Sequence, residues 1–262
     1  QWDQKTKDER GDERPCNEYN KLRVTIKRVV NDIRANRPSG KVRGTEDNDK
    51  DTAEVLEGLI RNIWNVSDGD TIFDSACEYQ VASGMGAWRV NVAYSSDTAF
   101  EQDIKIEGIR NPFCLYSDPA CHDPLKRDAR YWVLTTRISR TKYEQRWPKA
   151  DVVDFEEDAE FDDFDNDEDW ADEDNVRIVE YWYREKKKKT LNLLSDGSTV
   201  DSADAESMAA AQVQGLQVVR SREVNSDRIR MCIASGDAIL EEADWVGKEF
   251  PFILIYGENF VI

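Results

Sequence analysis

Few residues in this 262-residue sequence have the type and spacing that metal, nucleophilic or acid–base chemistry requires. The single histidine, His122, cannot build a histidine-based metal site by itself. Cys114 and Cys121 lie near it, but no CxxC or HxxxH spacing accompanies them. Cys121 and His122 are adjacent, and adjacent side chains point apart on most backbones, so they do not form a nucleophile with its base. We therefore expect neither a zinc site nor a cysteine nucleophile here.

The run Gly84-Met85-Gly86 has the glycines of a phosphate-binding loop but the wrong surroundings. A dinucleotide-binding loop follows a strand and opens a helix, whereas this run follows a helical pattern and precedes an alternating one. The sequence also contains no GxxxxGK[ST] and no GxSxG motif. We expect Gly84 to end a helix in the left-handed conformation, and we predict no cofactor-binding residue.

Carboxylates are abundant, and they are concentrated in residues 151–175. This segment contains fifteen Asp or Glu residues and no Lys or Arg. Four aromatic residues interrupt it: Phe155, Phe161, Phe164 and Trp170. Blocks of like charge are usually solvated or disordered, but the aromatic side chains indicate that this one docks against a surface. Because the acids form a run and are not separated at the ends of buried strands, we interpret the chain as non-enzymatic and predict no catalytic residue.

Part of the acidic segment resembles a calcium-binding loop. Asp163, Asp165 and Asp167 have the spacing of the first ligands. However, Glu168 occupies the position that needs Gly for a sharp turn, and Asp174 stands where the closing Glu belongs. We therefore do not expect a calcium site.

The chain is acidic and lacks the marks of a membrane or secreted protein. Its net charge is −18, which argues against a clamp that binds DNA, although not against a surface past which DNA slides. No apolar run is long enough to span a bilayer, and the first fifteen residues are polar. The five scattered cysteines indicate reduced thiols in a cytosolic setting. The sequence begins at Gln1 without Met and ends at Ile262 inside an apolar run, so we expect a piece of a longer protein.

Hydrophobic periodicity predicts helices first and strands afterwards. The predicted helices are 17–37, 52–66, a third one that ends at Gly84, 141–147 and 202–214. The predicted strands are 87–95, 101–110, 131–138, 176–183, 216–224, 228–234, 238–245 and 250–257. We expect the apolar stripes of the first three helices, including Val55, Leu56, Leu59, Ile60 and Ile63, to pack inward on the sheet. The four lysines at 186–189 would either pair with the acidic segment or form an exposed hairpin end. The fold class is thus α+β: N-terminal helices packed on an antiparallel β region, followed by a second small β-rich region with a short helix.

Several blocks between residues 15 and 260 occur in the order and spacing of a known family. The blocks are NDIRANRPS, VLEGLIRNI, GMGAWRVNVAY, NPFCLYSDP, VRIVEYWY and IASGDAILEEADWVGKEFPFILIYGEN. In this succession they resemble the portal proteins of short-tailed, podovirus-type tailed bacteriophages. None of them is a catalytic motif, so the resemblance rests on their order.

The resemblance implies a structural ring, usually of twelve subunits, at one vertex of the capsid. DNA would be packaged through the ring by the terminase and later ejected, and tail proteins would attach to it. The implied partners are other copies of the chain, the terminase large subunit, capsid and scaffolding proteins, tail adaptor proteins, and double-stranded DNA that passes without sequence-specific binding. The implied location is the virion, with the host cytoplasm during assembly, and no membrane partner is implied.

By the same analogy the chain divides into three parts. Residues 1–150 would form a wing-like α+β domain that ends in a short stem-like helix. Residues 151–175 would be an acidic linker, and residues 176–262 a clip-like β-rich region that is truncated at its end. The helices that line the channel in this family would lie beyond Ile262.

Two other classes of function fit parts of the sequence. A carboxylate-rich, metal-dependent phage DNA enzyme would use separated Asp and Glu residues to hold Mg²⁺ or Mn²⁺. An acidic DNA mimic would bind a basic partner through residues 151–175. Cleavage of plasmid DNA tests the first hypothesis, and deletion of the acidic segment tests the second.

Overall fold

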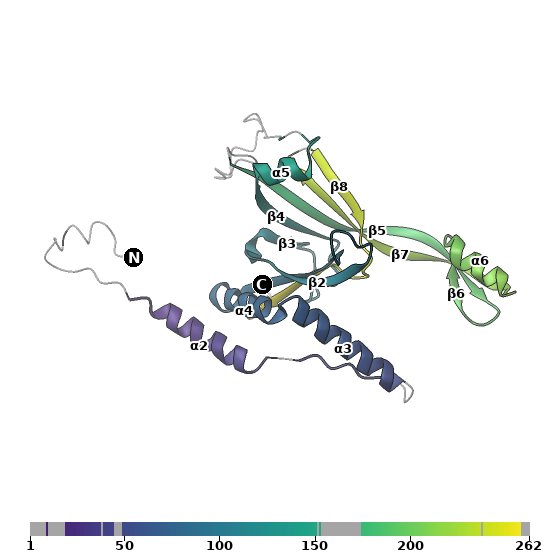
Figure 1. Cartoon of the computed structure of the whole chain (residues 1–262), viewed down its shortest axis with the longest axis horizontal. Coiled ribbons are helices and arrows are strands. Elements are labelled where there is room, and N and C mark those ends of the chain that lie inside the picture. Colours follow the sequence, from purple (N-terminus) through teal and green to yellow (C-terminus); the bar gives the residue numbers. More distant parts are fainter. Residues whose placement is uncertain are drawn as a thin grey trace. The chain divides into compact units, whose positions relative to one another are not determined.

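The computed structural model describes residues 19–37, 39–44, 49–150, 174–236 and 238–257, together with the isolated residues 9 and 152. Contacts divide the chain into two compact units, residues 1–112 with 251–262, and residues 113–250. The predicted α+β class is confirmed, because helices precede antiparallel sheets along the chain (Figure 1).

The first unit combines three helices with a small antiparallel sheet. Its elements are α2 (Lys21–Ala35), α3 (Lys50–Val66), α4 (Gly69–Ser83), β1 (Met85–Tyr94), β2 (Gln102–Gly108) and β9 (Phe252–Tyr256). The strand order is β2-β1-β9. The predicted hairpin is confirmed, since Trp88 pairs with Gly108 and Tyr94 pairs with Gln102. The last strand, β9, completes the sheet by pairing with the start of β1.

The corner between α4 and β1 depends on two glycines. Gly84 adopts a φ of 87° and donates its N–H to the carbonyl of Gln80 at 2.8 Å, which confirms the predicted helix end. A side chain at Gly86 would meet the backbone of Ala76 in α4. The helix therefore crosses the strand at backbone contact distance, and both glycines serve chain geometry.

The apolar stripe of α3 is not buried as the sequence predicted. Val55, Leu56, Leu59 and Ile60 are between 45% and 71% exposed, so the expectation that these four pack inward is wrong for the single chain. α3 contacts β2 and α4, but its buried residue is Ala53. Packing against the rest of the unit is concentrated near the C-terminal end of the helix, where Ile63 is half-buried and the ring centre of Trp64 lies 6.4 Å from that of Phe73 of α4. No described helix is both long and apolar enough to cross a membrane.

The helix α2 is held by ion pairs as well as by packing. Its C-terminal half contacts α4, where Val30 is buried. Arg34 lies 3.0 Å from the carboxylate of Asp74, and Arg37, just beyond the helix, lies 2.7 Å from the same group. The side chain of Leu22, at the other end of the helix, is exposed.

The second unit is built on a six-stranded antiparallel sheet. Its elements are β3 (Leu115–Ser117), β4 (Tyr131–Ser139), α5 (Arg140–Arg146), β5 (Asn175–Leu194), β6 (Thr199–Asp201), α6 (Ala205–Val213), β7 (Val218–Ser235) and β8 (Ala238–Asp244). A short 3₁₀ turn, η2 (Pro112–Cys114), precedes them. The order is β3-β4-β5-β7-β8, and β6 pairs with β5. The core consists of Tyr143, Trp147, Val176, Ile178 and Ile233, so α5 is packed onto the sheet.

Two strands of this unit are much longer than the sequence pattern indicates. β5 continues through Lys186–Lys189 to Leu194, where a strand of eight residues was predicted. β7 is one strand over Val218–Ser235, where two were predicted. The prediction that the four lysines form an exposed hairpin end is wrong, because each pairs with a residue of β7 within the ladder. The pairing satisfies the backbone while the long polar side chains remain in solvent. The alternative, pairing with the acidic segment, involves residues outside the described part and stays a prediction.

The contact-based units do not follow the three-part division drawn from the resemblance. The boundary between them falls after Pro112, since β4 and α5 pack with β5 and β7. The strand β9, which that division grouped with residues 176–262, pairs with β1 in the first unit. The wing-like and clip-like assignments remain predictions.

Candidate functional site

The histidine and cysteine residues considered for catalysis are engaged in a structural loop. The backbone N–H of His122 donates to the Asp128 carboxylate at 2.7 Å. Burial, and then the charge of Asp128, raises the pKa of the Cys121 thiol, so the nucleophilic thiolate is disfavoured. Cys114 accepts a hydrogen bond at its backbone carbonyl from the Thr135 hydroxyl. This arrangement provides no activated nucleophile.

Metal-binding geometry is absent from the described residues. Among them no three His, Cys, Asp or Glu side chains are grouped so as to hold a metal ion. The calcium-loop resemblance falls on residues 163–174, and all of these except Asp174 lie outside the described part.

A buried carboxylate that sequence reasoning did not single out organises the same loop. Asp118 is 2% exposed and accepts hydrogen bonds from Arg130 Nε at 2.8 Å, Ala120 N–H at 2.9 Å and Arg130 N–H at 3.2 Å. These donors, the guanidinium first, lower the pKa of Asp118 to about 2. A carboxylate saturated with donors stays ionised and is unsuited to general acid–base catalysis. The signal in the sequence is an Asp in the turn-rich run Ser117-Asp118-Pro119, where such side chains bind backbone N–H groups two residues on.

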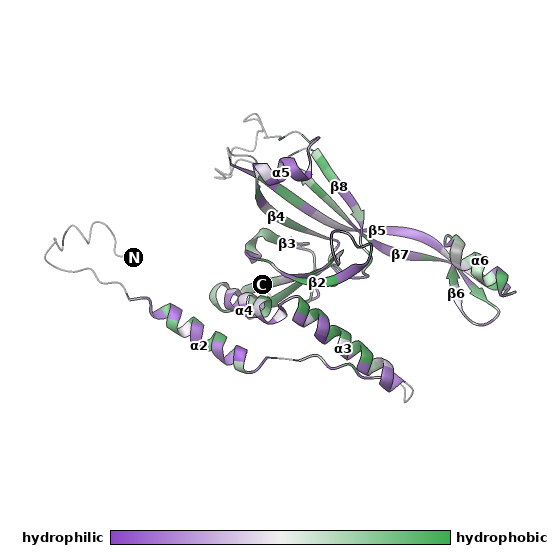
Figure 2. Cartoon of the chain, viewed as in Figure 1, coloured by the Kyte–Doolittle hydropathy of each residue, from purple (hydrophilic) through white to green (hydrophobic). Residues whose placement is uncertain are grey.

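The first surface that the described residues leave exposed is the apolar face of α3. We define the α3 apolar face as Val55, Leu56, Leu59 and Ile60. All four side chains are large, aliphatic and mostly exposed. Figure 2 shows hydrophobic residues along this helix. Exposed apolar side chains gathered on one helix are typical of a protein contact.

The second open surface is an arm formed by β5 and β7. β4 pairs with β5 only as far as Tyr183, and β8 pairs with β7 only from Arg230 onward. Beyond these points residues 184–194 and 218–229 form a ribbon of two strands, which β6 joins along Leu191–Leu193 and which ends at α6 (Figure 1). Eleven strand residues extend about 36 Å. We call this part of the chain the ribbon.

The end of the ribbon has its own small core. Asn192, Leu194 and Ala211 are buried there, and Asn192 donates to the Met208 sulfur at 3.7 Å. An isolated hairpin is marginally stable in water, so this packing at its far end supports the ribbon. Val213 remains 89% exposed, so the end also presents apolar surface.

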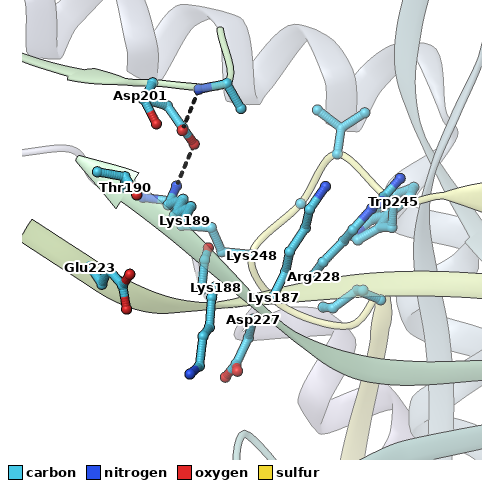
Figure 3. Close-up of a pocket in the computed structure, with 16 residues that line it drawn as sticks. Lys187, Lys188, Lys189, Thr190, Asp201, Glu223, Asp227, Arg228, Trp245 and Lys248 are labelled. Atoms are coloured by element: carbon cyan, nitrogen blue, oxygen red, sulfur yellow. Dashed lines mark hydrogen bonds and ion pairs between the residues drawn. The ribbon is translucent and has the colours of Figure 1, made fainter. Parts of the chain in front are cut away.

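A shallow groove of about 540 Å³ lies beside the ribbon. Half of the sixteen residues that line it are charged, and they include Lys187, Lys189, Arg228 and Lys248 (Figure 3). The Lys189 ammonium lies 3.7 Å from the Asp201 carboxylate. The groove contains neither a Cys nor a His, and its chemistry is that of an electrostatic contact surface.

Comparison with known proteins identifies the family of the chain. The chain matches the family described as Phage P22-like portal protein over residues 1–262. It is 27% identical over 266 residues to a portal protein from Acyrthosiphon pisum secondary endosymbiont phage 1. That alignment covers 95% of the chain, and the chain spans 36% of the length of the relative. The chain belongs to the P22-like family of phage portal proteins.

Proposed function

We propose that this chain is part of a structural portal subunit that assembles into a ring at one vertex of a phage capsid. DNA is packaged through this ring by the terminase and is later ejected, and tail adaptor proteins attach to it. The observation that carries the proposal is the family match along the whole chain. In this role the subunit is located in the virion, and it also contacts capsid and scaffolding proteins.

The α3 apolar face supports association between copies. Fully burying a Leu, Ile or Val side chain contributes about 1.5–3 kcal/mol, so covering four half-exposed ones contributes about 4 kcal/mol. Association costs about 4–15 kcal/mol in lost freedom. This face alone therefore does not hold two copies together, and a ring contact needs further surface. A contact between different faces of neighbouring subunits closes into a ring by rotation.

The charge of the chain suits a conduit for DNA. A net charge of −18 disfavours adhesion of phosphate, so DNA slides and does not bind. In this proposal the chain has no catalytic activity of its own, because the ATP hydrolysis that drives packaging belongs to the terminase.

Electron microscopy of the full-length gene product tests the proposal. Negative staining is expected to show rings with a central hole. Sedimentation should give a matching oligomer mass. A full-length product that stays monomeric over a wide concentration range contradicts the proposal.

A plasmid assay separates this role from that of a metal-dependent DNA enzyme. Plasmid incubated with the protein and Mg²⁺ or Mn²⁺ is expected to remain intact. Cleavage that disappears when two specific carboxylates are replaced would support the enzyme instead.

A further inference from the structure

The two faces of the ribbon differ in charge. Directly paired residues of an antiparallel ladder project to the same face, and successive residues alternate between faces. The pairs Glu185–Arg228, Lys187–Ser226, Lys189–Val224, Leu191–Arg222 and Leu193–Arg220 therefore share one face. We call its five cations, Lys187, Lys189, Arg220, Arg222 and Arg228, the basic ribbon face.

The opposite face is closer to electrical balance. It carries Lys186 and Lys188 together with Glu223 and Asp227. Arg184 on this side is paired with Glu249 at 2.9 Å. Figure 3 shows Lys188 and Asp227 pointing to the other side of the ribbon from Lys189 and Asp201. With Glu249 included, the three cations and the three anions on this face balance.

Three cations of the basic ribbon face form no ion pair with a described residue, and Glu185 is the only anion among the paired β5 and β7 residues named for this face. Arg228 is paired with Asp244, and Lys189 lies near Asp201. Lys187, Arg220 and Arg222 form no ion pair with any described residue. They are spread over about 20 Å of strand, since six residues separate Lys187 from the partner of Arg220. This row matches an extended acidic chain better than a single small anion.

The same sequence contains such an acidic chain. Residues 151–175 hold fifteen carboxylates and no cation, so this segment accounts for all but three units of the net charge of −18. Its aromatic residues, which include Phe161 and Phe164, offer apolar contact to Leu191 and Leu193 between the cations. Charge and composition therefore fit the basic ribbon face to this segment.

Chain length decides which copy supplies the segment. Val152 packs against the core of the second unit, and the carbonyl of Asp174 accepts the Arg140 N–H at 2.8 Å. The segment of 21 residues between them is fixed at both ends. Even fully extended, its midpoint can therefore lie at most about 38 Å from these anchors. Along β5 the partner of Arg222 lies sixteen residues from Asn175, about 53 Å away. The segment of one chain thus falls short of most of its own basic ribbon face.

We propose that the basic ribbon face of one subunit binds the acidic segment, residues 153–173, of a neighbouring copy. This inference rests on the proposed ring, in which each subunit has a neighbour on both sides. The contact is head-to-tail, because the donor and acceptor surfaces are different parts of the chain.

Zero-length cross-linking in mixed-isotope assemblies of the full-length gene product tests this contact. Copies labelled with ¹⁴N and ¹⁵N are mixed, assembled, and treated with a carbodiimide that joins Lys to Asp or Glu. Mass spectrometry is expected to find Lys189 joined to peptides from 153–173 in pairs of mixed isotope. Cross-links in same-isotope pairs only, or none to this segment, would overturn the proposal.

Charge reversal on the two faces gives a matched comparison. The double variant Lys187→Glu with Arg222→Glu flanks the reporter Lys189 and should lower the yield of mixed-isotope cross-links about tenfold, from the usual magnitude of exposed ion pairs. The double variant Lys186→Glu with Lys188→Glu changes charge equally on the opposite face and should leave the yield unchanged. Equal loss in both variants would contradict the proposal.

Two further measurements separate this proposal from its alternatives. Electron microscopy of the same samples shows independently whether rings form. Rings without cross-links would contradict only this contact, whereas the absence of rings would contradict the proposed function. Gel-shift titration with a 30-base-pair duplex tests nucleic acid as the occupant. Loss of duplex binding in the basic-face variant, with cross-links unchanged, would assign the face to DNA and overturn the proposal.

Discussion

Replacing Gly86 by Ala tests the close crossing of α4 over β1. A Cβ at this position would lie 2.8 Å from the carbonyl carbon of Ala76, inside contact distance of its oxygen, and 3.1 Å from Ile255 Cγ1. The Ala76 carbonyl is backbone within a helix, so it cannot rotate away as a side chain can. The helix must move off the strand, and we expect destabilisation of about 3 kcal/mol, at the upper end of overpacking costs.

Two other glycines of the first unit provide controls for the same chemical change. Gly58 is an exposed residue of α3 with nothing within 4 Å of a built Cβ, so Gly58→Ala should stabilise the unit by about 0.5–1 kcal/mol. Gly84 also has open space but a φ of 87°, so Gly84→Ala should cost about 1–2 kcal/mol. We therefore expect Gly58→Ala to be the most stable of the three variants, Gly84→Ala to be intermediate and Gly86→Ala to be the least stable.

Native-state hydrogen exchange measures these differences locally. Peptides from α4 and β1 should lose protection in Gly86→Ala, whereas peptides from β4 in the second unit serve as an internal reference. If the α4 and β1 peptides are as protected in Gly86→Ala as in Gly58→Ala, the helix and the strand do not approach as closely as the structure indicates.

Three further predictions address the buried carboxylate, the apolar face and a buried thiol. Asp118 has a pKa of about 2 against an ordinary 3.8, so it stabilises the fold above about pH 4 and this contribution is lost as the pH falls toward 2. Asp118→Asn should lower Tm at pH 7, and the difference in Tm from wild type should shrink between pH 4 and 2. The control variant Asp97→Asn should leave Tm unchanged. A difference in Tm that does not depend on pH would contradict the role of the ionised Asp118. Leu59→Ser should change the unfolding free energy of the single chain by no more than about 0.5 kcal/mol, but it should weaken association about fivefold, as measured by sedimentation. The control variant Glu54→Ser should not weaken association. If Leu59→Ser unfolds the chain, Leu59 belongs to the core. Burial, and then the charge of Asp74, raises the pKa of the Cys77 thiol, so iodoacetamide at pH 8 should alkylate it about tenfold more slowly in the native chain than in urea, and equal rates would refute its burial.

Local patterns were sufficient to predict the corner at Gly84. The helical period ends there, a period of two begins, and Gly is the residue that ends helices in the left-handed conformation. The role of Gly86 could not be predicted from the sequence. Gly86 lies against the backbone of Ala76, and this contact depends on how α4 packs across β1. A glycine next to a helix end is thus easily read as part of the same turn.

Long-range pairing explains what the sequence did not reveal. Four consecutive lysines have low strand propensity, yet Lys186–Lys189 pair with β7 across the chain, and such context overrides propensity. The partner of β9 lies more than 150 residues earlier, in β1, so no local pattern could assign it. The exposed side of α3 was mispredicted for a related reason, since periodicity identifies an apolar face but not which molecule covers it.

The two open surfaces of this chain differ in the kind of association they support. Burial of the α3 apolar face is non-directional, and its strength depends little on salt. The basic ribbon face is directional, since charge patterns fix register and reject wrong partners more than they add affinity, and salt screens it. A ring needs both properties, because each subunit must hold its neighbour and must also adopt one relative position for the circle to close. If the proposed contacts form, moderate salt should therefore disturb the regularity of rings before it disperses the subunits.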